Sequence, residues 1–187
     1  MADRVNSGRG GNKWMTAAWT TITALLLLTP AIAMQFTDEV NWTVGDFVFA
    51  GGMLVGAGVA YELAARVGNL AYQAGVVVAL GAGVLTMWVT GAVGIIGSED
   101  NPGNQLYIAV LVLAIAGAIV TGGRPARMMW VMCIAALATV LVPVIAYAGV
   151  AQPTSDVMAP EVFGATGFFT LLWLLSAWFF RTASRRA

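Results

Sequence analysis

The sequence predicts an all-α, polytopic helical membrane protein with six transmembrane helices and both termini in the cytoplasm. Of the 187 residues, 59% are hydrophobic and only 10% are charged, a composition that excludes an ordinary soluble domain. Six apolar stretches alternate with short polar loops, and about 20 helical residues cross the hydrocarbon core of a bilayer. The nine basic residues all lie in the tails and the even-numbered loops. This one-sided charge predicts the orientation, because Lys and Arg are retained on the cytoplasmic side during insertion.

The apolar stretches define the predicted spans in chain order. They cover residues 14–36, 46–65, 70–97, 106–121, 128–150 and 162–180. The connections are too short to hold a soluble domain, so neighbouring spans are expected to be antiparallel. We therefore expect one transmembrane domain over residues 14–180, between basic cytoplasmic tails at residues 1–13 and 181–187.

The first apolar stretch has two interpretations. Lys13, the leucine run that ends at Leu28 and the sequence Ala31-Ile32-Ala33 resemble a signal peptide with its cleavage site. The stretch continues to Phe36 and is long enough to span the membrane, which favours a retained helix. Cleavage would leave five spans and an N-terminus outside the cytoplasm.

The middle spans carry packing signals. The third is longer than a bilayer requires, so we expect it to tilt or to extend beyond the lipid. Small residues recur along it at every fourth position, at Ala71, Gly75, Ala79 and Gly83, a spacing that favours close helix approach. We expect this face to pack on the second span, because only a short turn joins the two. Pro143 lies inside the fifth span and predicts a kink.

The charged residues divide by side of the membrane. Two acids, Asp3 and Glu62, and all nine basic residues are assigned to the cytoplasm; the basic residues are Arg4, Arg9, Lys13, Arg66, Arg124, Arg127, Arg181, Arg185 and Arg186. Those assigned to the outer loops and their borders are Asp38, Glu39, Asp46, Glu99, Asp100, Asp156 and Glu161. No basic face alternates with aromatic residues, so the expected partner is the lipid bilayer and not nucleic acid.

Missing residue types narrow the chemistry. The chain has no histidine and one cysteine, Cys133. Without histidine, His-ligated haem, HExxH zinc catalysis and a Ser-His-Asp triad are excluded. Only an acid–base enzyme built on Glu99 and Asp100 would remain, and the sequence predicts no pocket around them. We therefore expect no catalytic residue, no metal ligand set and no cofactor, and we do not expect an enzyme.

The first candidate site consists of outer carboxylates. They are Asp38, Glu39, Asp46, Glu99 and Asp100. If the first two outer loops meet, these oxygens could hold a hard cation such as calcium, or contact a partner. Their spacing matches no EF-hand, which favours the alternative of a solvated acidic face imposed by topology. Asp46 also has a local explanation, because Thr43-Val44-Gly45-Asp46 is typical of a capping box.

The second candidate site is the pair Glu62 and Arg66 at the membrane edge. An acid four residues before a base on a helix favours an ion pair. An ionisable group so close to the membrane interior is also a candidate for moving a proton or an ion. Both interpretations are open, and the nearby arginine favours structural pairing.

Three stretches carry a family resemblance: Met34-Gln35-Phe36-Thr37-Asp38-Glu39-Val40-Asn41-Trp42-Thr43, Tyr61-Glu62-Leu63-Ala64 and Ala92-Val93-Gly94-Ile95-Ile96-Gly97-Ser98-Glu99-Asp100-Asn101-Pro102. They resemble a group of small, uncharacterised proteobacterial integral inner-membrane proteins. The resemblance extends from the first span to Trp178-Phe179-Phe180-Arg181. It implies a bacterial inner-membrane (plasma-membrane) location, and it implies no activity, ligand or site residue.

These observations favour one function and leave another open. We expect a non-catalytic inner-membrane helical bundle that acts as an accessory, scaffold or interaction protein, with a membrane-protein partner or a second copy of itself. The alternative is a small oligomeric transporter or channel for a cation or proton, with the acidic loops at its periplasmic mouth. Transporters usually carry polar or charged groups near the bilayer midplane, whereas the predicted interior offers mainly Thr86, Trp88, Thr90 and Thr139.

Overall fold

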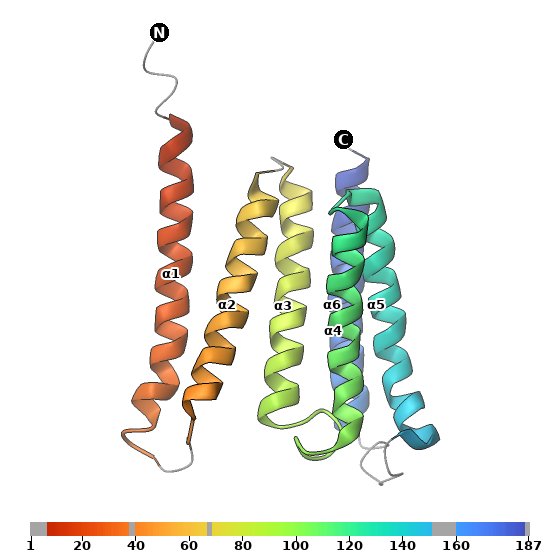
Figure 1. Ribbon diagram of the computed structural model, residues 1–187. Helices are drawn as coiled ribbons and strands as arrows, with labels where there is room; N and C mark the ends of the chain where they lie inside the picture. The colour runs from red at the N-terminus through yellow and green to blue at the C-terminus, as the bar shows by residue number, and fades with distance from the viewer. Residues whose placement is uncertain (1–6, 38–39, 67–68, 151–159, 186–187) are drawn as a thin grey trace. The chain divides into compact units, whose positions relative to one another are not determined.

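Helices make up most of the described chain, and no β-strand occurs in the described ranges. The computed structural model (Figure 1) describes residues 7–37, 40–66, 69–150 and 160–185. The chain divides into two units, Met1–Arg66 and Val67–Ala187. Each unit is described by itself below.

The first unit contains α1 (Ser7–Ala33) and α2 (Val44–Ala65), which pack against each other. The Trp19 indole N–H donates to the backbone carbonyl of Leu54 over 3.0 Å. Gly58 makes room for this ring, because a Cβ there would coincide with the Trp19 indole. A tryptophan at a helix interface usually finds a partner for its N–H, and here that bond ties α1 to α2.

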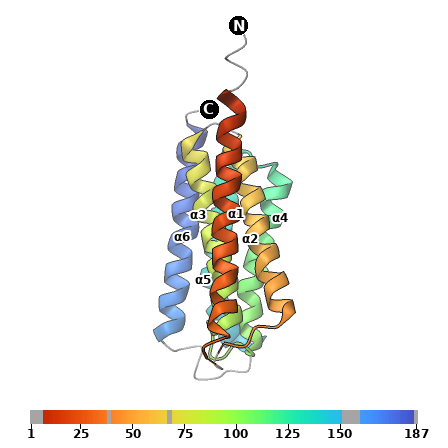
Figure 2. The same ribbon diagram turned by 90° about the vertical axis from the view of Figure 1, so that its left-hand side faces the viewer.

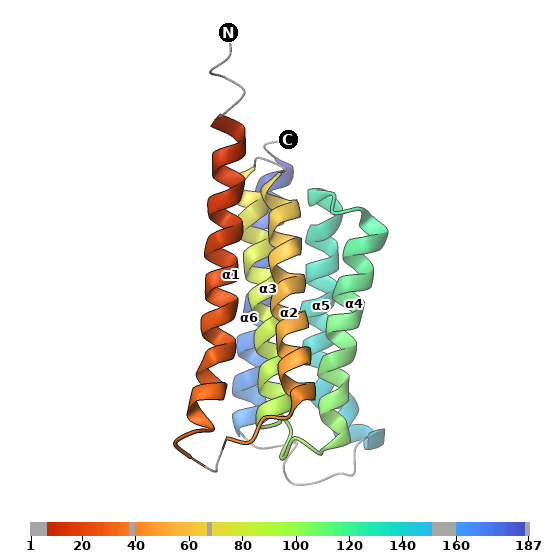
Figure 3. The same cartoon turned by 60° about the vertical axis from the view of Figure 1, so that its left-hand side comes forward.

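The second unit contains four longer helices and two short segments. They are α3 (Leu70–Ala92), η1 (a 3₁₀ helix, Pro102–Asn104), α4 (Gln105–Thr121), α5 (Pro125–Ile145), η2 (a π-helical turn, Ala146–Val150) and α6 (Pro160–Ser184). Helix α6 packs against both α3 and α5, and α4 packs against α5. Figure 2 shows α3 beside α6, and Figure 3 shows α4 beside α5. The core of the unit includes Phe169, Trp173 and Phe180 of α6, all buried.

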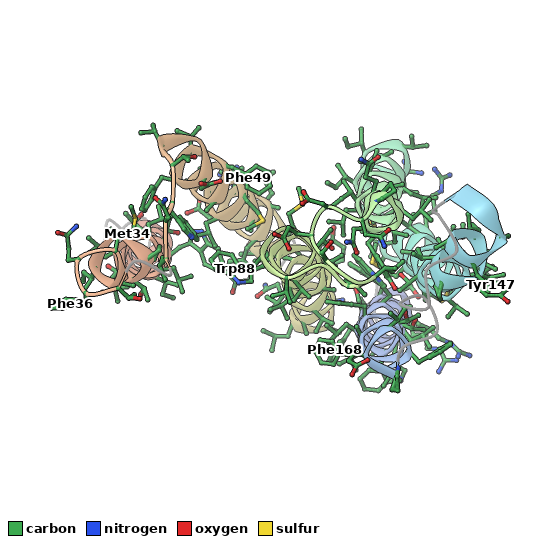
Figure 4. The ribbon with its side chains drawn as sticks, turned by 90° about the horizontal axis from the view of Figure 1, so that it is seen from below. Met34, Phe36, Phe49, Trp88, Tyr147 and Phe168 are labelled. Carbon is green, nitrogen blue, oxygen red and sulfur yellow. The ribbon has the colours of Figure 1, made fainter. Side chains whose placement is uncertain are left out.

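Among the described residues, five helical segments are long and apolar enough to cross a membrane. They are Val44–Ala65, Leu70–Ala92, Pro102–Thr121, Pro125–Ala148 and Pro160–Ser184. Large apolar side chains also point outward, as Tyr147 and Phe168 do in Figure 4, which suits contact with lipid. The prediction of an all-α helical membrane protein is confirmed at this level. The apolar part of α1, Trp19–Ala33, is shorter, so six spans and cytoplasmic termini stay predictions.

The small residue Gly75 of α3 lies in a packing face against α6. An added Cβ at Gly75 would lie 3.3 Å from atoms of Phe179 and Phe180. The Ser176 hydroxyl donates to the Gly75 carbonyl over 2.8 Å. At the end of the seam, the Asn69 side-chain amide donates to the Ala183 carbonyl over 3.3 Å. Close helix approach at Gly75 is therefore present, and α6 supplies it within the second unit. The predicted contact of this face with the second span would lie between the two units and stays a prediction.

Replacing Ser176 with alanine should weaken this seam modestly. The hydroxyl is fully buried, and interhelical hydrogen bonds in membrane proteins are worth about 0.6 kcal/mol on average. We expect a loss of that size in the free energy of unfolding, measured in mixed detergent micelles. Thr182→Ala is the matched control, because the Thr182 hydroxyl is exposed and bonds only within α6. Equal losses in the two variants would contradict a role for Ser176 in the seam.

Helices α4 and α5 approach closely around Gly117. A Cβ at Gly117 would lie 2.6 Å from Cγ1 of Val131. Helix α4 ends at Gly122, which has the left-handed φ of +60° that favours glycine. Pro125 then occupies the first turn of α5, where its missing N–H costs nothing. The turn is therefore short, and the two helices run antiparallel.

Helix α5 continues through Pro143, which is buried, to Ile145. Directly after it the backbone changes to the π-helical turn η2. Proline removes a backbone donor from the helical ladder, and π-helical turns are one way in which a helix accommodates such an interruption. The π-helical turn therefore begins three residues after the proline, and the kink at Pro143 stays a prediction.

The prediction of a third span that reaches residue 97 is wrong. Helix α3 ends at Ala92, and the apolar residues that follow belong to a folded loop. Gly94 has a φ of +79° and Gly97 a φ of +64°, values that end a right-handed helix. Ile95 and Ile96 are buried in the protein, at 5% and 0% exposure. Burial in the loop accounts for apolar residues at these positions, which do not continue a membrane-spanning helix.

Candidate functional site

The loop between α3 and α4, residues 94–104, is built around one buried side chain. Asn104 is 2% exposed. Its Oδ1 accepts hydrogen bonds from the backbone N–H groups of Ile95 and Ile96, both over 2.9 Å. Its Nδ2 donates to the carbonyls of Ser98, over 2.8 Å, and Ile96, over 3.4 Å. One amide thus satisfies both donors and acceptors of the turn, as buried polar groups require.

Two neighbours complete this loop, which we call the 94–104 loop. Gly94 lies against the backbone of Ser98, because an added Cβ would be 2.5 Å from the Ser98 carbonyl carbon. The Asn101 side chain caps η1 by accepting from the Gly103 N–H over 2.9 Å. The loop is therefore a folded platform with an internal hydrogen-bond network.

Glu99 and Asp100 lie on the exposed side of the 94–104 loop. They follow Ser98 in the turn that the Asn104 amide holds. Carboxylates held at the surface of such a platform can contact a cation or a polar partner.

The other predicted carboxylates belong to the first unit. Asp46 forms a capping box with Thr43: its Oδ2 accepts from the Thr43 N–H over 2.7 Å and from the Thr43 hydroxyl over 2.8 Å. The rings of Trp42 and Phe47 pack edge to face, with centroids 5.1 Å apart, as in a hydrophobic staple. The local explanation of Asp46 is confirmed, since its carboxylate serves the start of α2.

A site shared by all five carboxylates stays a prediction. Asp38 and Glu39 lie outside the described residues. Asp46 belongs to the first unit, and Glu99 and Asp100 belong to the second. Within the described residues, no group of three or more His, Cys, Asp or Glu side chains could hold a metal ion.

Glu62 and Arg66 lie at the end of α2. Glu62 is half-buried in the last turn, and Arg66 is the exposed C-cap residue one turn later. The helix therefore places the two residues on one face, as their spacing predicted. The choice between structural pairing and a proton or ion role stays open.

Hydroxyl groups make up most of the polar interior of the second unit. Tyr107 of α4 and Thr166 of α6 are hydrogen-bonded over 2.7 Å, and both are buried. Thr86 and Thr139 each donate over 2.8 Å to a carbonyl one turn earlier in their own helix. Among the described residues of this unit, the buried hydroxyls of Thr90 and Thr170 have no hydrogen-bond partner. Most interior hydroxyls thus join helices or bond within one.

The described charged side chains of the second unit lie at its ends. Those in the described ranges are Glu99, Asp100, Arg124, Arg127, Glu161, Arg181 and Arg185, and all of them are exposed. The buried part of the described unit is therefore apolar apart from hydroxyl and amide groups.

Asn104 is the residue of this site that sequence reasoning missed. An asparagine gives no signal of its own, because the residue is common in turns. The available signal was its position in the sequence. Asn104 follows the two glycines at 94 and 97 and comes just before the next apolar stretch. The backbone groups of the two buried isoleucines between those glycines need partners, and the Asn104 amide supplies the acceptor for both N–H groups.

Comparison with protein-family models, with curated proteins and with solved structures finds no match to this chain. The resemblance to small proteobacterial inner-membrane proteins therefore stays a prediction, as does the bacterial location that it implies.

Proposed function

We propose that the protein is a non-catalytic helical bundle of the bacterial inner membrane that acts as an accessory, scaffold or interaction protein. The observation that carries this proposal is how the second unit uses its buried polar groups. The Ser176 hydroxyl, the Tyr107–Thr166 pair and the Asn104 amide all bond to the protein itself. Polar side chains that hydrogen-bond within the protein and stabilise its packing support a structural role better than a catalytic one.

The 94–104 loop is the proposed contact surface for a partner. It combines a buried anchor with exposed carboxylates at Glu99 and Asp100. A surface held by its own hydrogen bonds loses little freedom on binding, which favours recognition. In the predicted orientation this loop lies outside the cytoplasm, so the proposed partner is another membrane protein or a second copy that reaches that side.

The test is purification at native expression level in a mild detergent, with mass spectrometry of the retained proteins. We expect a stoichiometric membrane-protein partner or a defined homo-oligomer with the wild-type chain. The double variant Glu99→Gln/Asp100→Asn should lose this partner or oligomer. Because both positions are exposed, the substitutions should change the free energy of unfolding by less than about 0.5 kcal/mol. Glu161→Gln is the control, because Glu161 is also an exposed acid of this unit.

Two outcomes would contradict the proposal. A monomer without any retained partner would leave the scaffold role without support. Ion or proton flux in liposomes above that of empty vesicles would favour the alternative, a small oligomeric cation or proton channel with an acidic mouth. The distribution of charge supports the first function, because the described charged residues of the second unit lie at its ends.

A further inference from the structure

The second unit has one strongly basic end. The arginines in residues 69–150 and 160–185 are Arg124, Arg127, Arg181 and Arg185, and all are exposed. They lie in the α4–α5 turn, at the start of α5 and at the end of α6, which Figure 3 shows at the same end of the unit. The acidic residues of the same ranges, Glu99, Asp100 and Glu161, belong to the opposite end. No described carboxylate of this unit therefore neutralises the arginines.

A shared aromatic contact brings the two groups of arginines together. A Cβ at Gly123, the residue before Arg124, would lie 2.8 Å from the Tyr72 hydroxyl oxygen. The Tyr72 ring packs edge to face on Phe180, the residue before Arg181, with centroids 5.3 Å apart. Both Tyr72 and Phe180 are buried. Arg124 and Arg181 thus extend from neighbouring points of one packed cluster.

Helices α5 and α6 each carry an exposed tryptophan one turn from an arginine, on the side away from the basic end. Arg127 precedes Trp130 on α5, and Trp178 precedes Arg181 on α6, which runs in the opposite direction. Trp130 is 64% exposed and Trp178 is 57% exposed. Residues three apart share a helix face, and tryptophan prefers the headgroup level of a bilayer. If the two rings lie at that level, the arginines one turn beyond them reach the height of the lipid phosphates.

The start of α5 adds uncompensated positive charge. Its N-cap residue is Arg124, which makes no capping hydrogen bond from its side chain, and its first turn has no acid. By contrast, Thr43 and Asp46 cap α2, and Asn69 caps α3. Arginine at a helix N-terminus is unfavourable unless an anion lies nearby, because the backbone dipole is positive there.

We propose that this end of the second unit binds the headgroup of an anionic phospholipid. The arginines would bind the phosphate oxygens of the headgroup through paired N–H donors, and their positive charge would complement its net negative charge. The exposed Trp130 and Trp178 would contact the adjoining acyl-chain boundary. A soluble anion could use the arginines but not these two rings, so the arrangement favours a lipid as the source of the phosphate.

The test uses the full-length protein in mild detergent, with native mass spectrometry of the lipids that it retains. Phosphatidylglycerol and phosphatidylcholine are supplied in equal amounts. We expect the wild type to retain mainly phosphatidylglycerol and Arg124→Gln/Arg181→Gln to lose that preference by about fivefold for each arginine removed. Arg124→Lys/Arg181→Lys should keep most of it, and Arg66→Gln, which removes an exposed arginine of the first unit, should keep it all.

Three results would overturn the proposal. The first is equal retention of the two lipids by the wild type. The second is an unchanged preference in the glutamine variant, with helix content by circular dichroism equal to that of the wild type. The third is displacement of phosphatidylglycerol by an equal concentration of inorganic phosphate, which would assign the end to a soluble anion. Should the glutamine variant not fold, the wild-type preference and its response to inorganic phosphate still test the proposal.

Discussion

Replacing Asn104 with alanine should destabilise the protein more than any other single truncation of a polar side chain in the 94–104 loop. The change leaves the buried N–H groups of Ile95 and Ile96 without an acceptor and removes the donor to Ser98. Each buried group left without a partner costs roughly 1 to 3 kcal/mol. We therefore expect a loss of about 3 kcal/mol or more, measured as the free energy of unfolding in mixed detergent micelles.

Asn101→Ala is the matched control for this prediction. It removes the same kind of side chain from the same loop, but only the single hydrogen bond from Gly103. A loss of about 1 kcal/mol is expected. Amide hydrogen exchange gives a second measurement, because the amides of Ile95 and Ile96 should exchange faster in Asn104→Ala than in Asn101→Ala. Equal behaviour of the two variants would show that Asn104 does not hold the loop.

The second large effect is expected for Gly117→Ala. The new methyl group would lie 2.6 Å and 3.0 Å from the two Cγ atoms of Val131. A valine side chain in a helix has one strongly preferred rotamer, so the overlap must be relieved by separating α4 from α5. Overpacking of this kind costs about 1 to 3 kcal/mol, measured as above.

Two variants separate overpacking from helix propensity. Gly81→Ala adds the same methyl group in α3, where no atom of the described neighbours lies within 4 Å of the added Cβ, and it should be neutral or stabilise by up to about 1 kcal/mol. Val131→Ala combined with Gly117→Ala should recover most of the loss, because the clash is removed. Failure of the double variant to recover would show that the methyl group acts elsewhere.

Much of the helical architecture could be predicted from the sequence, because membrane spans need long apolar stretches. The described part of the chain contains five such helices, and the Thr43–Asp46 capping box lies where the pattern predicted it. The end of the third span could not be predicted from hydropathy. A buried isoleucine and a lipid-facing isoleucine have the same apolar character, so Ile95 and Ile96 extended the predicted span. The two glycines at 94 and 97 were the better guide.

The helix that packs on the Gly75 face of α3 was harder to predict than the face itself. The spacing around Gly75 indicated close approach, and short connections favoured a neighbour in sequence. In the second unit α6 packs there, a helix from the far end of the chain. The candidate site shows the same limit: acidic residues such as Glu99 are visible as charges, whereas Asn104 acquires its role only when the fold brings Ile95 back to it.

The position of α6 has a consequence for biosynthesis. This helix is the last of the second unit to leave the ribosome, yet it packs on both α3 and α5. Until it enters the bilayer, the buried face of α3 at Gly75 and the Tyr107 hydroxyl of α4 lack the partners that Ser176 and Thr166 supply. Helices α3 to α5 therefore remain without their α6 contacts, in the membrane or beside the insertion machinery, until α6 has been inserted. The second unit matures only after translation of α6, whereas α1 and α2 can pair as soon as both have been inserted.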